Sequence, residues 1–167
     1  ERVYDVKYVQ ALHLNNYLPI NLQLLNTGRT QLNYTMNTGK LITSEQINSI
    51  GGKTRRFKSG FLHTVNLREA EIVIDDQWVK KLTGQTKLVD LNLEGSAITD
   101  SALETLSKLS SLETLDLSET HITDRALDTL KNMHHLKVLA LTSTQCSQEK
   151  IREIRAAMLN TRIIHID

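Results

Sequence analysis

The sequence predicts an α/β repeat fold in which short strand–turn–helix units stack side by side. The main observation is a 24-residue stretch that occurs twice. Residues 88–111 read LVDLNLEGSAITDSALETLSKLSS, and residues 112–135 read LETLDLSETHITDRALDTLKNMHH. A third start, LKVLAL, follows at Leu136, again 24 residues further on. Self-similarity at a fixed period indicates units that bury one shared core.

Each copy contains the signals for one strand, one turn and one helix. In the second copy, Leu112, Leu115 and Leu117 form the pattern LxxLxL, which places leucines on the inner side of a short strand. Thr123 and Asp124 are suited to begin a helix, because their oxygens can accept the free N–H groups of a first turn. Apolar residues then recur at helical spacing. Since each strand returns through a helix, we expect the strands to run parallel.

This pattern resembles the leucine-rich repeat family, whose general form is LxxLxLxxN-x-L, over residues 88–146. The ITD phrase resembles a bacterial-type 24-residue subclass with the form LxxLxLxxTxITD. The resemblance implies a right-handed leucine-rich-repeat solenoid with a parallel sheet on the concave side and helices on the convex side. Ser96, Thr120 and Thr144 stand where the family often has Asn or Cys. We therefore expect a ladder of hydroxyls that bond the backbone along the turns.

The repeat extends beyond its clear copies. Ile42 and Ile47 have the spacing of later turn and helix positions, so we count five units, the first two irregular. A helix is predicted over residues 44–50, stopped by Gly51-Gly52. A strand is predicted over residues 62–67, followed by a loop that is two residues longer than the later ones.

At the C-terminal end, a helix is predicted over residues 148–159 and a last strand over residues 161–166. Residues 1–40 do not show the repeat, and we expect them to form an irregular α/β N-terminal cap. Residues 41–167 are then the leucine-rich repeats, clear from residue 62, with a C-terminal edge strand. Both parts are expected to form one cooperative body, because terminal repeats must hide an open core end.

Composition limits the possible functions. Residues 1–60 carry a charge of +5 and residues 61–167 a charge of −4, so the net charge of +1 conceals an asymmetry. The longest apolar run is too short to cross a bilayer. One cysteine excludes an intramolecular disulfide and a zinc cluster. The sequence begins with Glu1 and not Met, which indicates a processed or truncated chain, so an upstream leader or anchor could be missing.

The candidate binding surface is the side of the sheet that faces away from the leucines, where this architecture usually binds partners. Its middle is polar and acidic, and its C-terminal end is apolar, which is the part least expected of an idle surface. The alternative is a generic solvated sheet. The predicted partner-binding residues are Thr64, Asn66, Asp90, Asn92, Glu94, Thr114, Asp116, Ser118, Val138, Ala140, Ile163 and His165.

A second candidate is the basic patch Lys53, Arg55, Arg56 and Lys58. Basic residues beside an aromatic can bind phosphates. The alternative is a solvated loop between two repeats. Because the whole chain is nearly neutral and has no nucleic-acid motif, we expect an acidic protein partner and no nucleic acid.

The other polar residues favour structural roles. Asp76, Asp100 and Asp124 recur every 24 residues and are interpreted as helix caps and first-turn charges. Cys146 replaces the Ile of ITD and should behave as a small buried apolar residue. No histidine pair has metal-ligand spacing and no nucleophile has a motif context, so we expect no catalytic residues, no metal and no cofactor.

These observations favour a non-catalytic protein–protein interaction module. One alternative is a structural accessory domain of a larger membrane-associated, cytochrome-like bacterial protein. Another is a substrate-receptor repeat of the F-box type, disfavoured because such repeats usually carry several cysteines. Self-association through the edge strand is possible. We expect no membrane insertion by this segment and a periplasmic or extracytoplasmic location, with the cytoplasm as the alternative.

Overall fold

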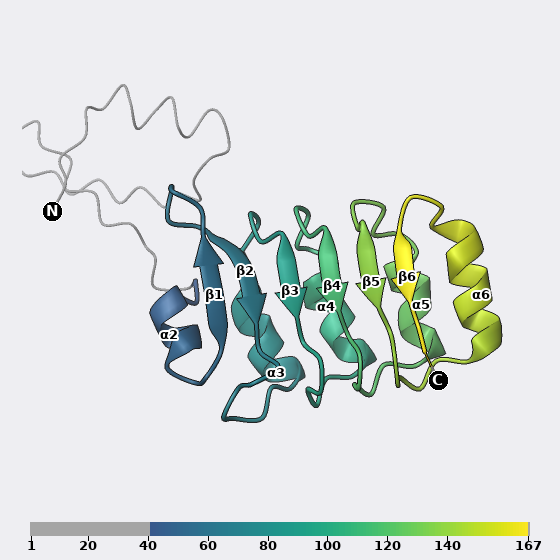
Figure 1. The fold of residues 1–167 in the computed structure, drawn as a ribbon, viewed down its shortest axis with the longest axis horizontal. Coiled ribbons are helices and arrows are strands. Elements are labelled where there is room, and N and C mark those ends of the chain that lie inside the picture. The colour runs from purple at the N-terminus through teal and green to yellow at the C-terminus, as the bar shows by residue number, and fades with distance from the viewer. Residues whose placement is uncertain (1–40, 167) are drawn as a thin grey trace, which may run out of the picture. The chain divides into compact units, whose positions relative to one another are not determined.

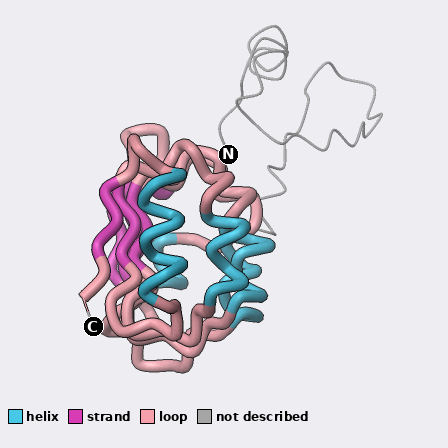
Figure 2. The backbone as a smooth tube through the Cα atoms, turned by 90° about the vertical axis from the view of Figure 1, so that its right-hand side faces the viewer, coloured by secondary structure: helices cyan, strands magenta, loops and turns pink. Residues whose placement is uncertain are grey.

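The computed structural model describes residues 41–166. The irregular cap predicted for residues 1–40 lies outside this part of the chain. Residues 41–166 form two layers, with a six-stranded sheet on one side and helices on the other (Figures 1 and 2). The strands follow one another in sequence order across the sheet. This α/β arrangement is compatible with a leucine-rich-repeat-like fold.

The strands are short, as expected for a repeat fold in which each short unit contributes one strand. They are β1 (Lys53–Arg56), β2 (Leu62–Asn66), β3 (Asp90–Asn92), β4 (Thr114–Asp116), β5 (Val138–Ala140) and β6 (Arg162–Ile164). The α-helices are α2 (Ser44–Asn48), α3 (Asp76–Val79), α4 (Leu103–Leu106), α5 (Asp124–Leu130) and α6 (Gln148–Ala157). Two 3₁₀ turns, η1 (Lys80–Leu82) and η2 (Asp100–Ala102), adjoin α3 and α4.

The sheet is parallel from β2 to β6, as predicted, but β1 is antiparallel to β2. The first part of the predicted basic loop is therefore a strand. It is joined to β2 by a turn in which Phe57 N–H donates to Phe61 O at 2.9 Å and Gly60 has φ +92°. The parallel prediction was wrong here because no helix separates these two strands, and a short turn can join only antiparallel strands.

Gly52 explains how α2 fits against this first strand. A Cβ atom at Gly52 would lie 2.6 Å from Ile47 Cγ2 and 2.9 Å from Ile47 O. The close approach thus requires glycine. The helix predicted over residues 44–50 is shorter in the structure, because α2 ends at Asn48 with Ser49 as its C-cap, and Gly51, with φ +83°, lies in the turn that follows.

The core is a stack of leucines contributed at the same position of each unit. The central strand leucines, Leu91, Leu115 and Leu139, are completely buried. They are adjacent across the sheet, since Leu91 pairs with Leu115 and Leu115 with Leu139. The period of 24 residues thus places each leucine directly beside its equivalent.

The ITD phrase joins neighbouring units on the helical side. Ile98 and Ile122 are fully buried, while Thr99 and Thr123 are N-cap residues, whose hydroxyls accept the N–H of Ser101 and Arg125. The aspartate that follows each cap receives hydrogen bonds from the next unit. Thr99 N–H and Oγ1–H donate to Asp76 at 2.8 and 2.6 Å, and Ser147 N–H donates to Asp124 at 2.7 Å.

The expected hydroxyl ladder is confirmed. Ser96, Thr120 and Thr144 each donate a hydrogen bond to the carbonyl oxygen three residues earlier, at 2.6, 2.5 and 2.8 Å. These bonds stay within one turn, so the ladder closes the turns and the aspartates join the units.

The last strand is shifted by one residue from the prediction. Leu139 pairs with Ile163, so Ile163 lies on the core side and packs against the core. Placing Ile163 on the partner-binding face was therefore wrong, and Arg162 and Ile164 occupy the two outward columns. His165 follows the end of β6, and its role in binding stays a prediction.

Candidate interaction face

We define the open face as the side of the sheet away from the helices. Figures 1 and 2 show that the helices of residues 41–166 cover only the other side. Strand pairing groups the outward side chains into two columns across the sheet. The upper column is Arg55, Thr64, Asp90, Thr114, Val138 and Arg162. The lower column is Lys53, Asn66, Asn92, Asp116, Ala140 and Ile164.

Eight of the predicted binding residues are placed on this face by the strand pairing, namely Thr64, Asn66, Asp90, Asn92, Thr114, Asp116, Val138 and Ala140. Glu94 and Ser118 follow their strands, but Ser118 is only 7% exposed and offers little surface to a partner. Their role in binding stays a prediction.

Sequence reasoning missed four residues of the columns. Lys53 and Arg55 join because β1 pairs with β2, a non-local contact that the sequence pattern does not indicate. The sequence did indicate the places of Arg162 and Ile164 in the columns, since the 24-residue period leads from Val138 to Arg162 and from Ala140 to Ile164. The prediction used a spacing of 25 residues at this point and lost the register.

Part of the lower column serves the turns. The side-chain oxygens of Asn66, Asn92 and Asp116 each accept a hydrogen bond from the backbone N–H two residues later, at 3.1, 2.9 and 2.9 Å. Such side-chain-to-backbone bonds stabilise tight turns. These three residues therefore have a structural role whether or not a partner binds.

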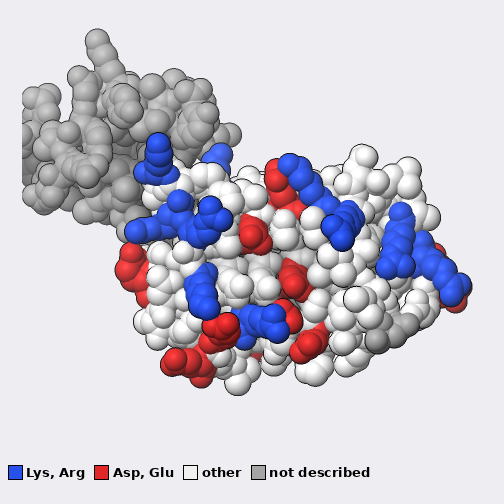
Figure 3. All heavy atoms as spheres, viewed as in Figure 1, with Lys and Arg blue, Asp and Glu red and all other residues white. Residues whose placement is uncertain are grey.

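Charge changes along the open face, which Figure 3 views directly. Lys and Arg side chains gather over β1, isolated Asp and Glu side chains lie over the middle strands, and uncharged surface surrounds the lower end of β5. Asp90 and Asp116 are the acidic members of the columns, and Val138, Ala140 and Ile164 are the apolar ones. The face thus has basic side chains over β1, an acidic centre, and an apolar region that lies beside the exposed Arg162 of β6.

The basic patch is partly neutralised. Lys53 Nζ lies 2.6 Å from Glu69, and Arg56 lies 3.3 Å from Glu45. Within residues 41–166, Arg55 and Lys58 form no ion pair. A patch of four free cations is therefore not present, and Arg55 is its member that also belongs to the open face.

Asp90 belongs to the open face, and its ionisation is perturbed. Partial burial raises the pKa of Asp90, and the neighbouring Asp116 raises it further. His63 and Arg55 act in the opposite direction but do not cancel the effect of burial. No cation of the described residues forms an ion pair with Asp90. The fold thus holds a carboxylate in surroundings that disfavour its charge.

The side chains that could bind a metal or act as a nucleophile lie in surroundings that suit a structural role. Over residues 41–166, no group of three His, Cys, Asp or Glu side chains is placed to hold a metal ion. Cys146 is half-buried against the core, with its Sγ 3.8 Å from Ile122 O, and burial raises the pKa of its thiol. A thiol with a raised pKa is a poor nucleophile at neutral pH. The helices of the described part include none with the length and apolarity that crossing a bilayer requires.

Comparison with known proteins supports the fold and leaves the family open. No family model matches the chain, and no curated protein matches it. A solved structure of actin-binding site 2 of leiomodin-1 is similar, with a TM-score of 0.51 and 14% sequence identity. The match covers 62% of this chain and 70% of the leiomodin-1 chain. At this level of identity the likeness concerns the fold.

Proposed function

We propose that this chain is a non-catalytic protein–protein interaction module of the leucine-rich-repeat type. In this proposal the repeats form a right-handed solenoid, and the open face is its concave, partner-binding side. The likeness to a solved protein-binding region supports the class of function, and it does not identify actin as the partner.

The proposal rests on the arrangement of charge and apolar surface over the open face. A sheet with no binding role is expected to carry mixed, well-solvated charges. Here a partly buried carboxylate, Asp90, lies between a basic strand and the apolar side chains Val138 and Ile164. Burial raises the pKa of Asp90 and so disfavours its charged form, and perturbed groups of this kind are common at binding sites.

A partner would use these regions in different ways. Apolar groups placed on Val138 and Ile164 would gain about 25 cal/mol for each Å² removed from water, whereas Ala140 is only 9% exposed and adds little. A cation placed beside Asp90 would lower the pKa of this carboxyl and favour its charged form. Acidic groups of the partner would face Arg55. Complementary charge mainly sets orientation and specificity, and apolar burial supplies affinity.

The test is affinity capture with the full chain and two variants. The face variant, Thr114→Arg/Val138→Asp, changes two outward positions that accept no cap or turn hydrogen bond. The matched control, Ser101→Arg/Arg125→Asp, makes similar changes at exposed positions on the helical side. We expect the face variant to lose proteins that the wild type and the control both retain. Equal capture by all three would contradict the proposal.

The accessory-domain alternative is favoured by a different observation. Leu159 is 85% exposed and Ile166 is 67% exposed, and both lie next to the edge strand β6. An apolar sheet end of this kind could dock on another domain or on a second copy of the chain. Light scattering of the wild type and of Leu159→Ser/Ile166→Ser would detect self-association, which the substitutions should abolish if β6 is the contact.

A further inference from the structure

The two columns of the open face differ in how far the fold already uses their side chains. In the lower column, Asn66, Asn92 and Asp116 accept hydrogen bonds from the backbone of their own turns. Lys53, in the same column, is paired with Glu69 at 2.6 Å. Most polar groups of the lower column thus already have partners within the chain.

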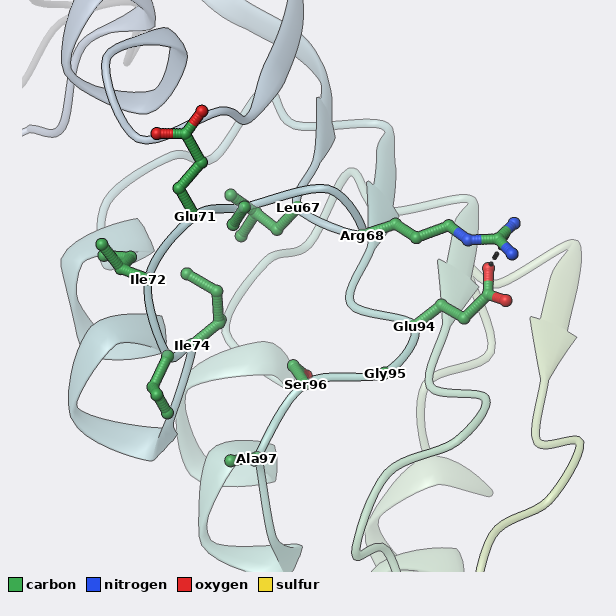
Figure 4. A pocket seen from close by; sticks show the side chains of 11 residues that line it. Leu67, Arg68, Glu71, Ile72, Ile74, Glu94, Gly95, Ser96 and Ala97 are labelled. Carbon is green, nitrogen blue, oxygen red and sulfur yellow. Dashed lines mark ion pairs between the residues drawn. The ribbon is translucent and has the colours of Figure 1, made fainter.

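The cation just below the lower column is paired as well. Arg68 lies 3.2 Å from Glu94, beside the pocket between the loops that follow β2 and β3 (Figure 4). The Glu94 side chain is only 17% exposed. A partner that bound at this lower edge would therefore have to replace contacts that the fold already makes.

The upper column is different, because its charged side chains are unpaired. Within residues 41–166, Arg55, Asp90 and Arg162 form no ion pair, and both arginines are exposed. Among the members of this column in the described part, Thr64 is the one with a side-chain hydrogen-bond contact, at 2.9 Å from His63 Nδ1. The groups available to a partner thus form one row across the strands.

The chemistry of this row changes in a fixed order from β1 to β6. It runs cation, hydroxyl, carboxylate, hydroxyl, apolar side chain and cation, contributed by Arg55, Thr64, Asp90, Thr114, Val138 and Arg162. Neighbouring strands lie about 4.8 Å apart, so along the row Asp90 is about 10 Å from Arg55, Val138 about 19 Å and Arg162 about 24 Å. An occupant of the row must match these intervals.

An α-helix matches the intervals better than an extended chain does. A helix advances about 10.5 Å over seven residues and about 21 Å over fourteen, and both steps return to nearly the same side. In an extended chain, residues on one side recur about every 6.6 Å, so the nearest ones fall about 3 Å before or beyond Asp90. The spacing of the row therefore favours a helix that lies across the strands.

We propose that the open face binds an α-helix of a partner protein along the upper column. An acidic side chain of this helix faces Arg55, and a basic one seven residues away faces Asp90. An apolar side chain fourteen residues from the first packs on Val138, and a second acidic one, about eighteen residues from the first, faces Arg162. This inference rests on the proposed function and adds to it the shape and charge order of the partner.

Other occupants are disfavoured by charge. A second copy of the chain, packed on the same face around a two-fold axis, would place arginines opposite arginines at both ends of the row, because Arg55 and Arg162 have the same sign. Residues 1–40 of the chain itself carry four Lys and Arg but only two Asp and Glu, so they also lack the required excess of acidic groups. The row is complementary to a segment with acidic ends.

The test measures binding of a fluorescent helical peptide to the full chain by anisotropy. The probe places glutamate, lysine, leucine and glutamate at these intervals in an alanine and glutamine background, and it is made in both sequence directions. We expect saturable binding of at least one direction. Moving the lysine by two residues turns it about 200° around the helix and should weaken binding about fivefold.

A second control has the same four side chains and two central prolines, which break the helix. It should bind about tenfold more weakly, since an unfolded peptide must be ordered on binding. No binding of the probe in either direction would overturn the proposal. Equal binding of the probe and either control would also overturn it.

Charge reversals test the order along the row. Arg55→Glu and Arg162→Glu change exposed side chains, and each should weaken probe binding about fivefold. Replacing the glutamate that faces Arg55 by lysine should restore binding to Arg55→Glu alone, and the same change at the other glutamate should restore binding to Arg162→Glu alone. Arg125→Glu, on the helical side, is the matched control and should bind as the wild type does. If either altered probe restored binding to both variants, net charge and not position would determine binding, and the proposal would be wrong.

The two proposals can fail separately. If Thr114→Arg/Val138→Asp loses captured proteins and yet no probe binds the wild type, the open face binds partners of another shape, and the helix is the part that is overturned. Equal capture by the wild type, the face variant and its control would instead overturn the proposed function.

Discussion

The carboxylate of Asp100 receives two hydrogen bonds from Thr123, one from its backbone N–H at 2.8 Å and one from its hydroxyl at 2.6 Å. Asp100 begins the helical turn of one unit, and Thr123 caps the helix of the next. The threonine of each ITD phrase thus caps its own helical turn and also bonds the aspartate of the preceding unit. The repeated ITD phrase is explained by this double use.

Removing this link should destabilise the chain. For Asp100→Ala we expect a loss of about 2 kcal/mol in the free energy of unfolding, because two charge-assisted bonds disappear and their donors lose their acceptor. Denaturant unfolding monitored by circular dichroism measures this loss. The matched control is Asp128→Ala, which removes an exposed ion pair with Lys131 and should have a much smaller effect. Equal losses in the two variants would mean that the inter-unit link stabilises the chain no more than an exposed ion pair does.

Replacing a stacked leucine should have a larger effect. Leu115→Ala removes a completely buried side chain with buried equivalents on both neighbouring strands. We expect a loss of about 2–5 kcal/mol, the usual range for a large-to-small change in a core. Leu159→Ala, at a position 85% exposed, should leave the unfolding midpoint almost unchanged.

Backbone conformation in the turns predicts opposite effects at equivalent positions. Gly95, Glu119 and Ser143 have φ values of +72°, +56° and +54°. Gly95→Ala should destabilise by about 1 kcal/mol, because alanine is strained in this region although its Cβ meets no neighbour. Glu119→Gly should be neutral or stabilising by up to about 1 kcal/mol, because it relieves the same strain. Thermal unfolding of both variants tests this, and a strong loss in Glu119→Gly would show that the Glu119 side chain has another role.

Asp90 predicts a pH dependence of definite sign. Its pKa is raised in the folded chain, so between the unfolded and folded pKa values the folded state binds more protons. Stability therefore falls as pH rises through this interval. Asp90→Asn removes that loss, so its stability relative to wild type should be greatest above the raised pKa and should shrink at acid pH.

The control for this pH series has the opposite sign. The hydrogen bond and charge of Lys131 lower the pKa of Asp128, so its stabilising effect is present at neutral pH and is lost as pH falls through the lowered value. Asp128→Asn should therefore show its small cost at neutral pH. If Asp90→Asn behaved in the same way as Asp128→Asn, burial would not be the dominant influence on Asp90.

The core of the repeats could be predicted because the 24-residue period alone determines which residues meet. Leu115 lies between Leu91 and Leu139 for this reason. The strand β1 could not be predicted, since Lys53–Arg56 has no apolar alternation and its pairing with β2 depends on a turn around Gly60. The link between Asp100 and Thr123 was also missed. Their recurrence indicated helix caps, but a bond between units depends on how closely the units stack.

The junctions between units determine how the length of the sheet changes when a unit is added or removed. Two successive junctions consist of the same contacts, since Asp76 bonds Thr99 just as Asp100 bonds Thr123. Deleting residues 99–122 would bring Ile98 directly before Thr123, and Asp76 would then face the cap that remains. Duplicating those residues would insert one more identical junction. Each such step changes the span between the two sheet ends by one strand spacing, about 4.8 Å, so genetic duplication can adjust the reach of the molecule without altering either end.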